Sequence, residues 1–290
     1  MDIDDQTDNS YIFYNNLAVF IHFASAISMI FLLQNKDPLV IPYTETYTQW
    51  NQIVNETCPI GSRELETSNG DFCIEAVTSP VDCDSENNCY GLNLGWLVIS
   101  FHLLSFGFQL LATLSNYTGP IFGYQYSVMV KKNKNPLRFI EYSFSASIML
   151  ISIALLNGVT DINLINSISI LTSACQLCGL VVEFIKEKKI KWLLHVVGWL
   201  QFCWAYGIIG HAFLRSLEAS KDSSNPGPPN FVYLIVILLF LLYSSFGFVQ
   251  LFELIFNINP ILKEKIYVML SLSAKLFLGW MIFSNVLLLS

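Results

Sequence analysis

Seven long apolar stretches follow one another along the chain, and polar segments separate them. A helix needs about 20 apolar residues to cross the roughly 30 Å hydrocarbon core of a bilayer. Each stretch reaches that length, so the pattern predicts an all-α integral membrane protein with a single seven-helix domain over residues 1–290. The expected helices lie at about residues 11–33, 92–115, 137–157, 162–185, 191–217, 231–256 and 266–289.

One polar segment, residues 34–91, is much longer than the others. Polar and apolar residues alternate in PLVIPYTETYTQW and FCIEAV, which predicts short strands, so we expect a β-rich cap here instead of a disordered linker. A glycosylation sequon begins at Asn55. The segment also contains four cysteines that predict two disulfides, with three pairings open. These are Cys58, Cys73, Cys83 and Cys89.

Composition agrees with a membrane protein. The chain has 53% hydrophobic and 13% charged residues, whereas soluble domains typically carry about 25% charged residues. The net charge of −7 comes largely from acids near the N-terminus and in residues 34–91. Nothing in this pattern favours nucleic acid as a partner.

Lysine and arginine collect on one side of the predicted bundle. Ten of the 15 basic residues lie in or beside the segments after the second, fourth and sixth helices, and four lie on the opposite side. Short loops rich in Lys and Arg stay in the cytoplasm, so we expect a cytoplasmic N-terminus and an extracellular or lumenal C-terminus. Residues 34–91 would then lie outside, where disulfides form.

One lysine lies inside the membrane region. Lys275 is near the middle of the last apolar stretch, where a charged residue costs roughly 2.5–3.5 kcal/mol on insertion scales. A nearby carboxylate would keep it charged, and Glu141 on the third helix is the natural partner. Two interpretations are open: a buried ion pair that fixes helix register, or an amine that forms a Schiff base with an aldehyde cofactor. Seven helices with a lysine in the seventh favour retinal as that cofactor.

Two stretches carry a family resemblance. They are RFIEYSFSASIMLISIALLNGVTD (residues 138–161) and LSLSAKLFLGWMIFSNVL (residues 270–287). Together with His22 and His102 on the first two helices, they resemble the heliorhodopsins, a rhodopsin family with inverted membrane orientation. The resemblance covers essentially all seven helices and implies a rhodopsin-like bundle.

The resemblance implies roles for residues around a cofactor. Lys275 is expected to bind all-trans-retinal as a protonated Schiff base, and Glu141 is expected to be its single counterion. Arg138, one turn before Glu141, is expected to tune that carboxylate from the cytoplasmic side. Ser271, one turn before Lys275, matches a family serine close to the Schiff base.

Four further residues are implied near the cofactor. His22 and His102 match an intramembrane histidine pair, part of a polar, water-containing group that is expected to receive the Schiff-base proton. Taken singly, each histidine is equally well explained as a satisfied core residue. Tyr142 is expected to pack against the polyene, and Tyr243 is expected to form an aromatic wall. No metal site is expected.

The pattern of acids argues against ion pumping. Ordinary microbial pumps place an Asp one turn before the lysine and a second carboxylate eleven residues after the first, and here these positions are Ser271 and Ser152. Glu183 and Glu253 lie close to predicted cytoplasmic helix ends, where a solvated role is expected. We therefore expect a light receptor, not an enzyme, in which photoisomerisation drives a photocycle and a conformational signal.

Two alternatives remain at this point. One is a light-gated proton or cation channel, and the other is a seven-helix receptor or transporter that does not absorb light, in which Lys275 is structural. The family resemblance also implies a homodimer in the lipid bilayer. A signalling partner is expected, but the sequence does not identify it.

Overall fold

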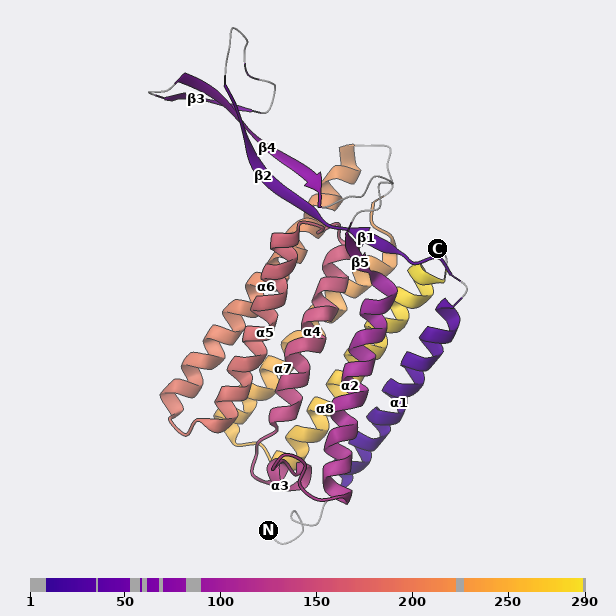
Figure 1. The fold of residues 1–290 in the computed structure, drawn as a ribbon. Helices are drawn as coiled ribbons and strands as arrows, with labels where there is room; N and C mark the ends of the chain where they lie inside the picture. Colours follow the sequence, from indigo (N-terminus) through magenta and orange to yellow (C-terminus); the bar gives the residue numbers. More distant parts are fainter. Residues whose placement is uncertain are drawn as a thin grey trace.

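The computed structural model describes residues 9–34, 36–52, 58, 62–67, 70–81, 90–222 and 227–288. Seven of the described helices are long and apolar enough to cross a membrane, and they lie side by side in one bundle (Figure 1). The prediction of a membrane protein with seven such helices is confirmed. The seven are α1 (Ser10–Leu33), α2 (Leu94–Tyr117), α4 (Pro136–Leu156), α5 (Ile162–Phe184), α6 (Lys188–Asp222), α7 (Asn230–Phe256) and α8 (Pro260–Ile282).

Two helices, α6 and α8, begin several residues earlier than the sequence predicts. The helix α8 begins at Pro260 instead of near residue 266, because the Asn259 side chain accepts a hydrogen bond from the Ile261 N–H and a proline occupies the first turn. Both features are typical of helix starts. The far end of α8 leads into a π-helical turn, η1 (Phe283–Leu287). The helix α6 extends beyond both of its expected ends.

The helices α4 and α8 form the centre of the bundle. Their most apolar windows are 72% and 56% buried, against 33% or less for the other five spans. The helix α4 packs against α2, α5, α6 and α7, and α8 packs against α1, α2 and α7. These two central helices carry Glu141 and Lys275 respectively, so both charged residues are placed far from lipid.

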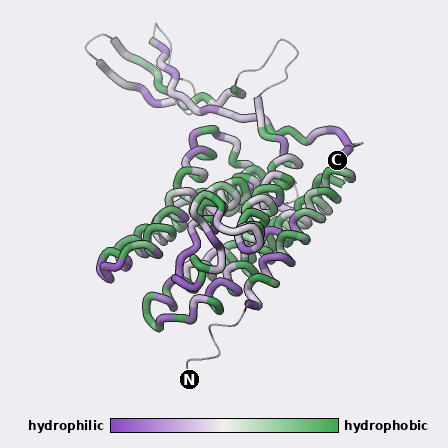
Figure 2. The backbone as a smooth tube through the Cα atoms, turned by 60° about the horizontal axis from the view of Figure 1, so that its bottom comes forward, coloured by the Kyte–Doolittle hydropathy of each residue, from purple (hydrophilic) through white to green (hydrophobic). Residues whose placement is uncertain are grey.

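The outer surface of the bundle suits a bilayer. Hydrophobic residues run along the helices, whereas hydrophilic residues gather at helix ends and in the strands (Figure 2). Large apolar side chains such as Phe20 and Trp204 are 68% and 70% exposed. Extended apolar surface of this kind marks contact with a membrane or a partner, and the seven spans identify the membrane.

Strands form the connection between α1 and α2. The strands β2, β4 and β3 make an antiparallel sheet in that order, and β1 pairs with β5. Figure 1 shows the larger sheet projecting beyond the bundle. Its base is fixed where the Thr44 N–H donates to the Thr160 carbonyl oxygen at 2.9 Å. The strands are β1 (Val40–Pro42), β2 (Thr44–Gln52), β3 (Arg63–Thr67), β4 (Gly70–Pro80) and β5 (Gly91–Asn93).

A disulfide joins Cys58 and Cys73 in this connection, with Cα atoms 5.5 Å apart. The prediction of a β-rich, disulfide-containing segment between the first two membrane helices is therefore confirmed. The other two candidate cysteines, Cys83 and Cys89, and the sequon residue Asn55 lie outside the described residues.

A short helix that the sequence does not predict closes the opposite end. This helix, α3 (Tyr126–Lys131), contacts α2 and α8. Tyr126 is only 1% exposed, and its ring packs edge-on against Tyr11 with centroids 5.6 Å apart. We call the end of the bundle where α3 and the start of α1 lie the α3 end (Figure 1). We call the opposite end, which carries the β-strands, the strand end.

Candidate functional site

A buried ion pair joins the two central helices. The Lys275 Nζ donates to Glu141 Oε1 at 2.7 Å and to Ser271 Oγ at 2.9 Å. Lys275 and Glu141 are each only 2% exposed. The structure thus brings together the lysine, the carboxylate and the serine that the sequence singles out. A charge pair at this depth is stabilised by mutual attraction, and neither member is stable there alone.

A second hydroxyl group that sequence reasoning missed also reaches the carboxylate. Ser105 on α2 is fully buried, and its Oγ lies 2.7 Å from Glu141 Oε1 as a donor. Its position three residues after His102 puts both side chains on one face of α2. This three-residue spacing could have identified Ser105 from the sequence, because it places the serine on the same inward face of α2 as His102.

The two intramembrane histidines contact each other beside this pair. The Nδ1 atoms of His22 and His102 are 3.0 Å apart, so one ring donates and the other accepts. Both Nε2 atoms are buried and have no hydrogen-bond partner among the described residues. Gly279, one turn beyond Lys275 toward the strand end, makes room for them, because a Cβ there would lie 2.6 Å from His102 Nε2.

An open space begins at Lys275. A cavity reaches its side chain, and a neighbouring cavity shares four lining residues with it. The shared residues are Tyr142, Gln176, Tyr243 and Phe246. The two cavities together form one elongated, largely aromatic space that runs from Lys275 toward α5 and α6.

Both predicted aromatic residues lie in this space. The ring centre of Tyr142 is 5.0 Å from Lys275 Nζ, and the Tyr142 hydroxyl donates to the Tyr267 carbonyl oxygen at 3.1 Å. Tyr243 lines both cavities, and its ring stacks near Phe202 with centroids 6.3 Å apart. The two tyrosines therefore form walls of the space that Lys275 faces.

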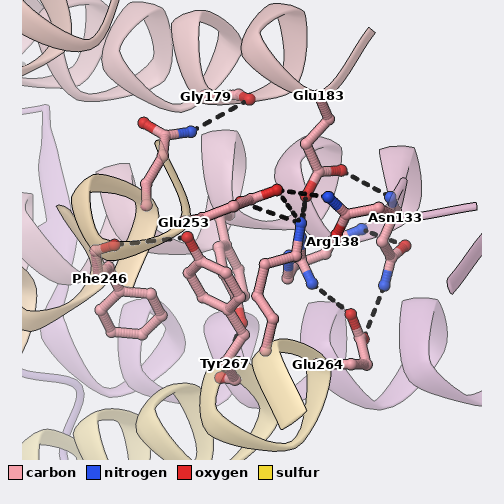
Figure 3. Close-up of polar contacts among 12 residues, drawn as sticks. Asn133, Arg138, Gly179, Glu183, Phe246, Glu253, Glu264 and Tyr267 are labelled. Atoms are coloured by element: carbon pink, nitrogen blue, oxygen red, sulfur yellow. Dashed lines mark hydrogen bonds and ion pairs between the residues drawn. The ribbon is translucent and has the colours of Figure 1, made fainter. Parts of the chain in front are cut away.

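Arg138 lies one turn before Glu141 on α4 and makes its ion pairs with other carboxylates. Its guanidinium forms ion pairs with Glu183 on α5 and Glu264 on α8, and it does not pair with Glu141. Lys263 extends the group, with Nζ 2.9 Å from Glu183 and 3.1 Å from Glu253. Figure 3 shows Glu183, Glu253 and Glu264 gathered near Arg138. We call the five residues Arg138, Glu183, Glu253, Lys263 and Glu264 the Arg138 cluster.

The expectation that Glu183 and Glu253 are solvated is therefore wrong. The side chain of Glu183 is 2% exposed and that of Glu253 is 13% exposed. The physical reason is the segment before α4, which folds over the α3 end. There the Asn135 N–H donates to Glu183, and the Asn133 side-chain amide donates to Glu253. These donors and the two cations replace water around the carboxylates.

Comparison with known proteins identifies a family and a fold. The sequence model of a family described as Heliorhodopsin matches residues 12–287. The comparison with curated proteins gives no match. The fold is similar to a thermophilic rhodopsin from Rubrobacter xylanophilus, with a TM-score of 0.59, 14% identity, and 94% of this chain and 95% of that chain covered.

The transmembrane domain of a rhodopsin phosphodiesterase from Salpingoeca rosetta is also similar. Its TM-score is 0.52, its identity is 12%, and 66% of this chain and 70% of that chain are covered. At such identities the two structures show that the seven-helix rhodopsin fold is shared. They carry no information about whether an activity is shared.

Proposed function

The chain belongs to the heliorhodopsin family of light-sensing rhodopsins, and we propose that it is a light receptor with all-trans-retinal attached to Lys275. Membership implies a retinal chromophore within the membrane. The observation that carries the residue assignment is the buried Lys275–Glu141 pair, because it lies at one end of an elongated aromatic space. A purely structural role for this ion pair would not explain why an open space lies beside it.

The residues present fit retinal. A primary amine, the Lys275 Nζ, is the group that condenses with an aldehyde, and the adjoining walls are mostly aromatic or small. Tyr142, Tyr243 and Phe246 offer rings to a flat polyene. When bound, retinal supplies absorption of visible light and isomerisation from all-trans to 13-cis.

The chain's own residues hold the proton at the Lys275 nitrogen. Glu141 supplies the opposite charge at 2.7 Å, and Ser271 accepts a hydrogen bond from the same nitrogen at 2.9 Å. The Ser105 hydroxyl donates to the same Glu141 oxygen and so helps to orient the carboxylate. Because Lys275 and Glu141 stabilise each other's charge, a movement that separates them changes the protonation of both. That change is the local event from which a conformational signal starts.

We propose a receptor instead of a pump because the chain has serines where a relay needs acids. Ser271 occupies the position one turn before Lys275, and the Ser152 hydroxyl donates to the Ile148 carbonyl oxygen, 2.9 Å away within α4. A serine hydroxyl is not ionised at neutral pH, so neither serine can replace the carboxylate that a proton relay needs.

A light-gated channel is the second candidate. A cavity between Glu141 and Glu264, lined in part by charged and amide side chains, favours it, because this cavity leads from the ion pair toward the α3 end. Toward the strand end, however, buried hydrophobic side chains that include Met29, Val98 and Leu278 fill the described interior. Photocurrents in a voltage-clamped cell separate the two functions: steady light-driven current supports the channel, and its absence at all voltages supports the receptor.

The orientation, assembly and domain organisation belong to the same proposal. Excess Lys and Arg at the α3 end support a cytoplasmic N-terminus and an outer location for the strands. Family membership supports a homodimer with an unidentified signalling partner, and we treat residues 34–91 as an insertion into one retinal-binding domain.

Absorption spectra of the membrane-expressed chain with all-trans-retinal test the proposed function. A visible band in the wild type is expected, and Glu141→Gln should shift it strongly because the opposite charge next to Lys275 is lost. Glu218→Gln is the matched control, since Glu218 is an exposed carboxylate paired with Arg215. A wild-type chain without a visible band would overturn the proposal.

A further inference from the structure

The two edges of the larger sheet are built differently. The strand order places β2 at one edge and β3 at the other. The strand β3 has only five residues, and its sequence RELET contains three charges. The strand β2 has nine residues, pairs with β4 in one continuous register without a bulge, and contains a single charged residue, Glu45. Short length, charges, prolines and bulges are the usual features that prevent an edge from pairing with another chain. The β3 edge has two of these protections, whereas the β2 edge is open.

The backbone groups of every second residue in β2 point away from the sheet. The Thr44 N–H donates to the Thr160 carbonyl oxygen at 2.9 Å, and that oxygen lies outside the sheet. Backbone hydrogen-bonding directions repeat every two residues along a strand. The N–H and C=O groups of Thr46, Thr48 and Trp50 therefore face outward as well. They have no backbone hydrogen-bond partner among the described residues.

The base of the β2 edge already accepts an extended segment. Thr44 forms a parallel bridge with Asp161, and the hydroxyl oxygens of Thr44 and Thr160 lie 3.1 Å apart. The chain then turns into α5 at Ile162, so this contact ends after one position. A segment that lies farther along the edge would form the main-chain hydrogen bonds used in β-strand addition.

Exposed aromatic side chains lie on both faces of β2. Tyr47 is 47% exposed and Trp50 is 55% exposed. Because side chains alternate along a strand, these two residues point to opposite faces of the sheet. The Trp50 ring packs edge-on against Phe72 of β4, with centroids 6.2 Å apart. An added strand would therefore meet an aromatic side chain on each of its faces, and aromatic residues are enriched where proteins bind one another.

Charge indicates the chemistry of the segment that fits this edge. Residues 34–91 contain ten acidic and two basic residues, a formal charge of 2 − 10 = −8, whereas the whole chain carries −7. A second copy of the chain would bring the same negative charge to the edge, and like charges across an interface are unfavourable. A cationic segment is complementary instead.

The acidic side chains also favour one face of the sheet. Glu45 and Tyr47 share a face with Gln49, and Gln49 is opposite Glu75 in the register. A basic side chain on this face of an added strand would meet the Glu45 carboxylate, and it could also lie over the Tyr47 ring. The opposite face offers Trp50 to an apolar side chain.

We propose that the β2 edge is a docking site for an extended cationic segment of another protein. The segment adds as a fourth strand beside β2, and its main chain bonds to the outward groups of Thr46, Thr48 and Trp50. Its basic side chains face Glu45, and its apolar side chains face Trp50. The sheet projects beyond the bundle (Figure 1), so the segment binds without entering the membrane. Binding requires neither light nor retinal and is independent of the proposed function.

A peptide-binding measurement tests this docking site. The purified full chain in lipid nanodiscs is titrated against a fluorescent peptide of about eight alternating Lys and Val residues, a typical strand length. We expect saturable binding, read as fluorescence anisotropy, that weakens as salt is added. A peptide of alternating Glu and Val residues with the same length should not bind.

Two pairs of variants separate the backbone contribution from the charge contribution. Thr48→Pro removes one outward N–H and should lower the affinity about tenfold, because a ladder bond is lost. Thr48→Val, the matched control, keeps that N–H and should bind like the wild type. Glu45→Gln should weaken binding and reduce its dependence on salt. Its control is Glu218→Gln, an exposed carboxylate on α6 that should leave binding unchanged.

Each outcome decides the proposal. Absence of saturable binding to the wild type, equal binding of the Glu–Val peptide, or unchanged affinity in Thr48→Pro would overturn it. Circular dichroism and a single elution peak check that each variant is folded. If Thr48→Pro does not fold, Glu45→Gln decides, and an affinity equal to that of Glu218→Gln would count against the proposal. A peptide that converts dimers into monomers would show that a second copy occupies the β2 edge, which would overturn its assignment to another protein.

Discussion

The bundle contains two buried groups of charges that differ in design. The Lys275–Glu141 pair has one cation and one anion on two helices, and serine hydroxyls complete its shell. The Arg138 cluster has five charges on α4, α5, α7 and α8. Breaking the one ion pair between Lys275 and Glu141 separates the two charges completely. The Arg138 cluster, by contrast, keeps three of its four ion pairs when any one of them breaks. The pair is therefore suited to switching, and the cluster is suited to holding the α3 end of the bundle together.

Arg138→Ala should have the largest effect on stability. The change removes both ion pairs of the guanidinium and leaves Glu264 buried without a cation. Breaking a buried pair by removing one partner typically costs about 3–5 kcal/mol. Thermal loss of the pigment should occur at a much lower temperature than in the wild type. A variant as stable as the wild type would show that the cluster does not hold the α3 end together.

Gly279→Ala should have the next largest effect, near the pair. The added Cβ would lie 2.6 Å from His102 Nε2 and 3.3 Å from the Met29 methyl group, and overpacking of this kind typically costs about 1–3 kcal/mol. The matched control is Gly210→Ala, because nothing lies within 4 Å of that position. Equal thermal stability of the two variants would contradict the tight packing of the histidine pair.

Ser105→Ala should have a smaller effect that concentrates on the chromophore. Glu141 loses one hydrogen bond, and such a bond contributes about 0.5–1.5 kcal/mol. We expect a shifted visible absorption maximum with little loss of stability. Ser152→Ala, which removes a buried hydroxyl that donates to the Ile148 backbone oxygen, should leave the maximum unchanged. Identical spectra for both variants would exclude Ser105 from the environment of the pair.

Arg215→Ala should have the smallest effect. Its side chain is 69% exposed and pairs with Glu218, which is 61% exposed. Exposed ion pairs contribute about 0–1 kcal/mol, so thermal stability should match the wild type within that range. A loss comparable to that of Arg138→Ala would mean that burial does not distinguish the two arginines.

Much of the fold and part of the site were predictable from the sequence. The seven spans follow from apolar length alone, and the strands of the first connection follow from alternation. Lys275 and Glu141 stand out because charged residues are rare in such stretches, and their proximity follows from the cost of burying either one alone.

The Arg138 cluster was not predictable from the sequence, because its formation depends on how the α3 end folds. Glu183, Glu253 and Arg138 lie close to helix ends in the sequence, where solvent is the usual neighbour. The segment that contains α3 covers that end and brings Asn133 and Asn135 onto the carboxylates. Ser105 was missed for another reason, since serine is common on helix faces and its contact with Glu141 depends on helix rotation.

The most direct test of the central claim compares two buried lysines on α8. Lys275→Ala and Lys263→Gln are each expressed with all-trans-retinal, and their visible absorption is measured. Lys263 is as buried as Lys275, at 2% exposure, but it belongs to the Arg138 cluster. We predict that Lys275→Ala loses the visible band completely and that Lys263→Gln retains it. A visible band of wild-type position and intensity in Lys275→Ala would contradict the assignment of retinal to this lysine.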